Sequence, residues 1–126
     1  MEIFNKAKRF KEAVEENKAS TEKLEALYQE MFEIFSKHPT TQKELLPVMA
    51  EALAYKISSL IKRRQVSISD AKEVVEDFFA FVEIQRLSEN EMNEVIKKVS
   101  DTFESILGVY IKIKGLETEA VLRIDS

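Results

Sequence analysis

The sequence predicts a mainly α-helical domain of about five helices, with one or two short β-strands in the C-terminal third. Three observations predict this fold. Apolar residues recur at three- and four-residue steps along most of the chain, capping residues separate these segments, and the 126 residues include only two glycines and two prolines. A chain of this length can bury one core without disulfides or metals. We therefore expect residues 1–126 to form a single domain.

Two amphipathic helices are expected first, over residues 3–14 and 24–35. The second ends at Lys37-His38-Pro39, because a residue before proline disfavours helical backbone. The simplest arrangement is a helical hairpin. Their apolar positions are Phe4, Ala7, Phe10 and Val14 in the first, and Leu24, Leu27, Tyr28, Met31, Ile34 and Phe35 in the second.

A third helix is expected to begin near Leu46 and to end at Lys62-Arg63-Arg64. Thr41 and Glu44 have capping-box spacing, but Pro47 lacks the N–H that a continuous helix would use. The terminal cations suit the negative end of a helix dipole. The apolar face consists of Met49, Leu53, Ile57, Leu60 and Ile61.

Two further helices have serine caps. Ser67 or Ser69 precedes the fourth helix, whose inward positions are Ala71, Val74, Val75, Phe78 and Phe79. Ser88 and Glu91 form a capping box for the fifth. The helical period of the fifth continues for about five turns, over Met92, Val95, Ile96, Val99, Phe103, Ile106, Leu107 and Tyr110.

Alternating residues predict the strands. Val82–Leu87 (VEIQRL) is expected to form a short strand, and Ala120–Ile124 (AVLRI) a second. Residues 109–114 allow two readings. Either they form a strand in a hairpin with AVLRI, or the fifth helix continues to Lys114 and ends with Gly115 as its cap. The second reading gives a strand–helix–strand unit with a right-handed parallel crossover.

Composition excludes several kinds of chemistry. The chain has no cysteine and one histidine, His38, so thiolate nucleophiles, zinc–thiolate sites and histidine pairs are unavailable. It has no apolar run of membrane-spanning length and no signal-like N-terminus, and we expect a soluble, cytoplasmic protein. The abundance of Lys and Glu is typical of thermophiles.

Cations occur in two clusters although the net charge is −4. The negative total does not favour nucleic acid, so binding to phosphates would need local convergence of cations. The usual role of such clusters is to form the solvated faces of amphipathic helices. His38, beside Pro39, is expected to be solvated or to cap a helix, and most aromatic residues are expected in the core. The clusters are Lys6, Lys8, Arg9 and Lys11, and Lys56, Lys62, Arg63 and Arg64.

Residues 50–126 resemble a PIN domain, the nuclease fold of VapC-type toxins, in the order of their segments. These are AEALAYKISSLIKRRQVS, SDAKEVVEDFFAF, VEIQRLSENEMNEVIKKVSD, TFESILGVYIKIKG and EAVLRIDS. The resemblance implies an α/β fold and a Mg²⁺ or Mn²⁺ site for phosphodiester hydrolysis, with Glu51 and Asp125 as ligands. The family's first aspartate has no counterpart, Asn5 being the nearest residue. Its helix aspartate falls at Ser105, beside Glu104, so the resemblance implies a depleted site.

These observations lead to three functional expectations. The first is a non-enzymatic helical module for interaction or assembly, which needs no cofactor and acts through a protein partner or as a homo-oligomer; an unpaired AVLRI edge would favour pairing. The second is a PIN-like metal-dependent ribonuclease, or its inactive descendant, with Glu51 and Asp125 at the metal. The third is a small nucleic-acid-binding protein that uses Lys56, Lys62, Arg63 and Arg64.

Overall fold

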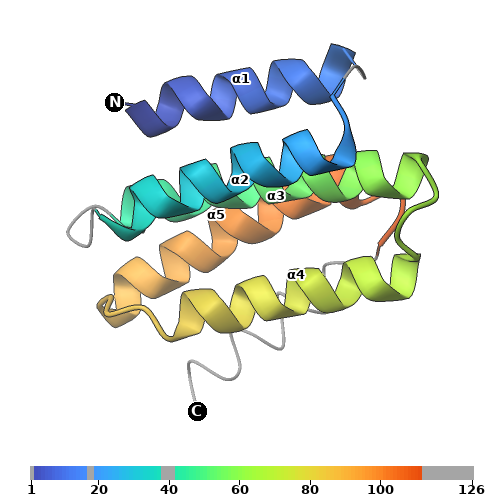
Figure 1. Cartoon of the computed structure of the whole chain (residues 1–126). Helices are drawn as coiled ribbons and strands as arrows, with labels where there is room; N and C mark the ends of the chain where they lie inside the picture. The colour runs from blue at the N-terminus through green and yellow to red at the C-terminus, as the bar shows by residue number, and fades with distance from the viewer. Residues whose placement is uncertain (1, 17–18, 38–41, 112–126) are drawn as a thin grey trace.

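The computed structural model describes residues 2–16, 19–37 and 42–111, and this part of the chain forms five helices. Each helix runs roughly antiparallel to the one before it, so that α1, α3 and α5 point the same way (Figure 1). The predominance of helix agrees with the sequence prediction. The helices are α1 (Glu2–Glu16), α2 (Thr21–Ser36), α3 (Gln42–Lys62), α4 (Ile68–Glu83) and α5 (Glu89–Leu107).

Helix α3 lies at the centre and packs against all four other helices. Helices α1 and α4 lie on opposite sides of the bundle, with α2, α3 and α5 between them (Figure 1). The most extensive close approach is between α3 and α5. Small side chains allow this, because the distance between two helix axes depends on the side chains at their contact. The small buried residues are Ala50, Ala52, Ala54, Ser58 and Ser59 on α3 and Ser100 on α5.

A chain of phenylalanine rings connects α2, α4 and α5. Phe35 contacts Phe81, Phe81 contacts Phe78, and Phe78 meets Phe103 edge to face, with ring centroids 5.6 Å apart and an interplanar angle of 83°. Such tilted and edge-to-face pairs add stabilisation beyond the area that the rings bury. Phe32 and Phe79 extend the chain at its two ends. These contacts place most of the predicted core aromatic residues in the interior or at its edge.

The strand predicted at Val82–Leu87 is wrong. Helix α4 continues to Glu83, and Val82 is fully buried as the next inward position after Phe78 and Phe79. The apparent alternation comes from a helix end followed by the exposed cap residue Ile84. The described residues contain no strand, so the α/β arrangement implied by the PIN resemblance lacks its strand at 82–87. Residues 108–110 form a turn, whereas 112–114 and the predicted strand 120–124 lie outside the described residues.

The predicted start of the third helix also needs correction. Helix α3 begins at Gln42 and includes Pro47. The ring removes one hydrogen bond, the one that would reach the Lys43 carbonyl in the first turn, and the helix tolerates that loss close to its N-terminus. Thr41, the proposed cap, lies outside the described residues. Two residues expected to point inward, Phe4 and Val74, are exposed.

Helix α3 ends in a Schellman motif that forces Arg64 into left-handed backbone. The Gln65 N–H donates to the Leu60 carbonyl at 2.9 Å, and the Arg64 N–H donates to the Ile61 carbonyl at 3.0 Å. Arg64 has φ = 57°, which is the conformation that glycine usually supplies at this position. A side chain with a Cβ costs about 1–2 kcal/mol in this conformation.

We therefore expect Arg64→Gly to raise the free energy of unfolding by about 0.5–1 kcal/mol, the relief of strain being partly offset by the greater freedom of glycine in the unfolded chain. Urea denaturation measures this change. Arg64→Ala is the matched control, since it removes the same charge and keeps the Cβ. Equal stabilisation by both substitutions would show that the backbone conformation is not the cause.

The predicted capping box at the start of α5 is confirmed. The Glu91 N–H donates to Ser88 Oγ, and the Ser88 N–H donates to Glu91 Oε1, each at 3.2 Å. The hydrogen bond from the Ser88 backbone lowers the pKa of the Glu91 carboxyl below its usual value of 4.5, and Lys43 at 3.9 Å adds a smaller effect. The ionised carboxylate therefore stabilises the folded state.

We expect Glu91→Gln to destabilise the protein at neutral pH and the difference from wild type to disappear in acid. Glutamine keeps the acceptor oxygen, so the substitution removes the charge alone. Because the folded-state pKa is lowered, the benefit is present above pH 4.5 and is lost as the pH falls through the folded-state value. Urea denaturation at several pH values tests this, with Glu94→Gln on the same helix as the control. A difference independent of pH would contradict the charge-based explanation.

Candidate functional site

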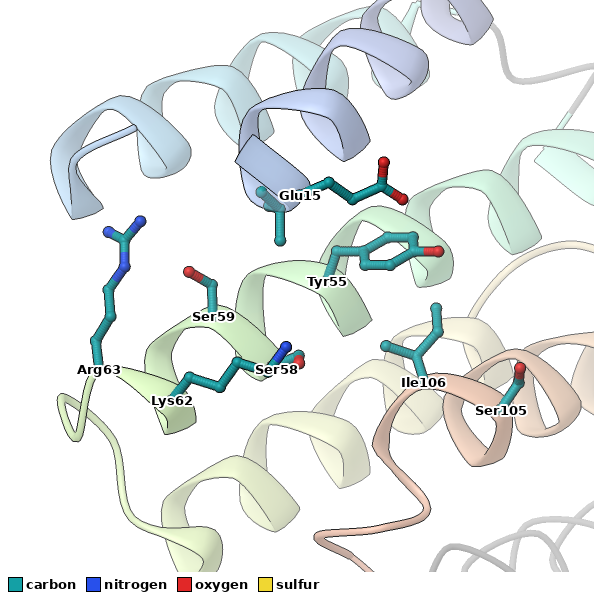
Figure 2. Close-up of a pocket in the computed structure, with 9 residues that line it drawn as sticks. Glu15, Tyr55, Ser58, Ser59, Lys62, Arg63, Ser105 and Ile106 are labelled. Carbon is teal, nitrogen blue, oxygen red and sulfur yellow. The ribbon is translucent and has the colours of Figure 1, made fainter. Parts of the chain in front are cut away.

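A groove runs along α3 between α1 and α5, and its deeper part encloses about 620 Å³. Val14 and Glu15 of α1 form one wall, and Ser105 and Ile106 of α5 form the other (Figure 2). The remaining lining comes from the last two turns of α3 and the residue after it: Tyr55, Ser58, Ser59, Lys62 and Arg63. We call this part of the groove the serine hollow.

The groove continues into a shallower hollow of about 310 Å³, which we call the acidic hollow. Tyr55, Ser105 and Ile106 line both hollows and so join them. The acidic hollow adds two carboxylates, Glu51 of α3 and Asp101 of α5, together with Lys11 of α1 and Thr102 of α5. Among the described lining residues, cations therefore outnumber carboxylates in the serine hollow, and carboxylates outnumber cations in the acidic hollow.

Two serines form a buried polar floor in the serine hollow. Ser58 and Ser59 are only 7% and 5% exposed, and both line the cavity. Among the residues that the structure describes, neither hydroxyl has a hydrogen-bond partner. The two hydroxyl oxygens are also absent from the fully buried atoms that lack a partner, so they are accessible in the cavity and can donate to a bound molecule.

The cations of the groove have different surroundings. The Arg63 guanidinium donates a 2.5 Å hydrogen bond to the Ala19 carbonyl and so joins the end of α3 to the segment between α1 and α2. Lys62 is exposed at the rim, and its side chain extends back along α3 toward Ser58 (Figure 2). Lys11 lies 5.6 Å from the centre of the Tyr55 ring. Tyr55, followed by Glu15 and Glu51, raises the pKa of Lys11.

The described residues include only one of the two metal ligands implied by the PIN resemblance. Glu51 lines the acidic hollow near Lys11, while Asp125 lies outside the described residues. Ser105 lines both hollows, and Asn5 is exposed on α1. Among residues 2–16, 19–37 and 42–111, no group of three or more His, Asp or Glu side chains is arranged to hold a metal ion.

The four cations proposed for nucleic-acid binding do not share one surface. Lys56 faces α2, where it pairs with Glu25 and lies 5.0 Å from the centre of the Tyr28 ring. This pair lowers the pKa of Glu25, while burial, with a smaller effect of Glu25, raises the pKa of Tyr28 well above its usual value. Lys62 and Arg63 instead line the groove, and Arg64 is exposed in the turn after α3.

The N-terminal cations are likewise divided. Lys6 pairs with Glu30 of α2 at 3.0 Å, and Lys11 lies over Tyr55 in the groove. Lys8 and Arg9 are exposed, and so is Phe4, which lies one turn before Lys8. His38 lies outside the described residues. Only the middle of this cluster is therefore presented to solvent as a basic surface.

The outward surface of α4 combines acidic and apolar side chains. Asp70, Glu73, Glu76 and Asp77 are exposed along the helix, and Lys72 is its one basic residue. Val74 and Ile84 are exposed on the same helix and its cap, and Ile84 is 76% exposed. We call these six acidic and apolar residues the α4 face. A contiguous exposed apolar patch rimmed by polar residues is typical of an interaction surface, whereas single exposed apolar residues are normal.

No protein-family model, curated protein or solved structure matches the chain. No described helix combines the length and the apolar character needed to cross a membrane. The groove and the α4 face are the described features from which a function can be inferred.

Sequence reasoning selected Lys62 and Arg63 as cations but missed the residues that surround them. Glu15, Ser58, Ser59 and Asp101 enter the groove through the relative positions of three helices. No local motif marks them in the sequence. The only available signal is the helical spacing of Tyr55, Ser58 or Ser59, and Lys62, which places them along one side of a helix.

Proposed function

We propose that the protein is a non-enzymatic helical interaction module that associates with further copies of itself. In this proposal the α4 face of one copy receives the first half of α1 from another copy. The observation that carries the proposal is the pair of complementary exposed surfaces on opposite sides of one bundle.

The α4 face supplies negative charge and apolar contact area. Asp70, Glu73 and Asp77 follow helical spacing, Val74 lies among them, and Ile84 lies beyond them at the C-cap of the helix. A partner surface that fits must be basic and must carry at least one apolar side chain, because like charges disfavour association while complementary potentials steer it.

The first half of α1 has both properties. Phe4 is 46% exposed, and Lys8 lies one turn further along the helix on the same side. Arg9 is also exposed. Within one molecule these residues cannot reach α4, because α1 and α4 lie on opposite sides of the bundle (Figure 1). A second copy can supply the contact.

Contact between two different surfaces is heterologous, so a pair of copies leaves one α1 surface unused on one copy and one α4 face unused on the other. Association then proceeds head to tail. It should weaken as salt is added, because exposed charges are screened beyond about 8 Å at physiological ionic strength.

Sedimentation velocity on two charge-reversed variants tests this arrangement. Lys8→Glu with Arg9→Glu blocks α1 and leaves the α4 face intact, whereas Glu73→Lys with Asp77→Lys blocks the α4 face and leaves α1 intact. We expect wild type to form species larger than a dimer at low salt and high concentration. Each variant alone should be monomeric, since every contact would bring together two surfaces of the same charge.

An equimolar mixture of the two variants gives the decisive result. Because each variant keeps one native surface, and the two reversed surfaces are also complementary to one another, the mixture should associate again. Lys97→Glu with Lys98→Glu on α5 is the control, since it changes the net charge equally at exposed positions of another helix. A monomeric wild type at every concentration, or equal loss of association in the control, would overturn the proposal.

A further inference from the structure

We propose that the serine hollow binds a small organic anion with an apolar body, such as a carboxylate on a hydrocarbon chain. The inference depends on the groove between α1, α3 and α5, and it stands independently of the association through α4.

The floor of the serine hollow favours an anionic group on the ligand. Ser58 and Ser59 are more than nine-tenths buried, line the cavity and have no hydrogen-bond partner among the described residues. A hydroxyl can donate to an anionic oxygen, and a hydrogen bond to a charged group is about twice as strong as one between neutral groups. An anionic head group at this floor would satisfy both serines.

The distribution of charge gives the sign of the ligand and its position. Among the described residues that line the serine hollow, Lys62 and Arg63 are cations and Glu15 is the one carboxylate. Among the described residues that line the acidic hollow, the carboxylates Glu51 and Asp101 outnumber the one cation, Lys11. An anionic head group therefore favours the serine hollow, where Lys62 extends toward the floor from the last turn of α3 (Figure 2). Arg63 adds positive potential at the rim while it donates to Ala19.

The walls favour an apolar body on the ligand. Val14 of α1 lines the hollow together with Ile106 of α5 and Tyr55 of α3, and Figure 2 shows Tyr55 and Ile106 on neighbouring helices. The volume of about 620 Å³ lies within the range of pockets that hold small organic ligands, about 300–1,000 Å³. A short alkyl chain can lie along these side chains with its head group at the serines.

Octanoate is a suitable probe, and two molecules of the same length, octylamine and octanol, vary only the head group. Titration of ¹⁵N-labelled full-length protein, followed by NMR, reports affinity and position together. We expect octanoate to shift the amide signals of Val14, Tyr55, Ser58 and Ile106 at saturable concentrations. Octylamine and octanol should bind this hollow much more weakly.

Two substitutions with opposite expected effects separate charge recognition from mere structural damage. Lys62→Met removes the cation but keeps an apolar stem, and should weaken octanoate binding about tenfold. Glu15→Gln removes the opposing carboxylate and should strengthen binding. Ser58→Ala with Ser59→Ala should weaken binding, with little effect on stability because the hydroxyls have no partner to lose. Lys97→Met, which lines neither hollow, is the control.

Three outcomes would overturn the proposal. In the first, octylamine or octanol binds the hollow as tightly as octanoate, so that the anionic group has no role. In the second, Lys62→Met and Glu15→Gln leave the affinity unchanged. In the third, octanoate shifts the signals of Val74 and Ile84 rather than those of the groove, which would identify only nonspecific contact with exposed apolar residues of α4.

Discussion

The structure depends on one packing constraint: α3 must contact four other helices at once. A helix in this position needs apolar or small side chains on most of its circumference, and α3 meets the requirement with alanines and serines between larger residues such as Leu53 and Ile57. The small residues allow α5 to approach closely. The larger ones fill the remaining space, so that α1, α2 and α4 pack around the same helix.

The same constraint explains where the groove lies. Near the C-terminal end of α3 the small positions are Ser58 and Ser59, and α1 and α5 flank them on either side. Alanine at these positions would give an apolar floor, whereas serine gives an equally small floor with hydroxyl groups. Small side chains allow close packing in the middle of α3, and near its end the small side chains are serines, which supply hydroxyl groups to the cavity. The cations at the end of α3, which the negative end of the helix dipole stabilises, lie beside these two serines.

The sequence predicted the helices well, because their periodicity and their caps are local properties. Ser67 and Ser88 mark the starts of α4 and α5, and the Ser88–Glu91 capping box is present. The strand at 82–87 was wrong because the last inward residue of α4, Val82, happens to be followed by an exposed Ile84, and four residues cannot distinguish the two periods. The predicted start of α3 was wrong because the energetic cost of a proline depends on how near it lies to the start of the helix. Pro47 lies close to that start, so the helix includes it.

The candidate site was predictable only in part. Lys62 and Arg63 were recognised as cations, but as part of a nucleic-acid surface with Lys56, which instead pairs with Glu25. Glu51 was selected through a resemblance, and the structure places it beside the groove with Asp101, a residue that no motif indicated. Which faces of α1, α3 and α5 meet is decided by long-range packing, and a single sequence does not contain that information in any short segment.

Native-state hydrogen exchange tests the central position of α3 most directly. If α3 is the helix on which the other four depend, the amides of its buried middle, from Ala50 to Ile57, should exchange only through global unfolding, while amides of the outer helices α1 and α4 exchange through smaller openings with lower free energies. Protection of α1 or α4 equal to or greater than that of α3 would contradict this account of the fold.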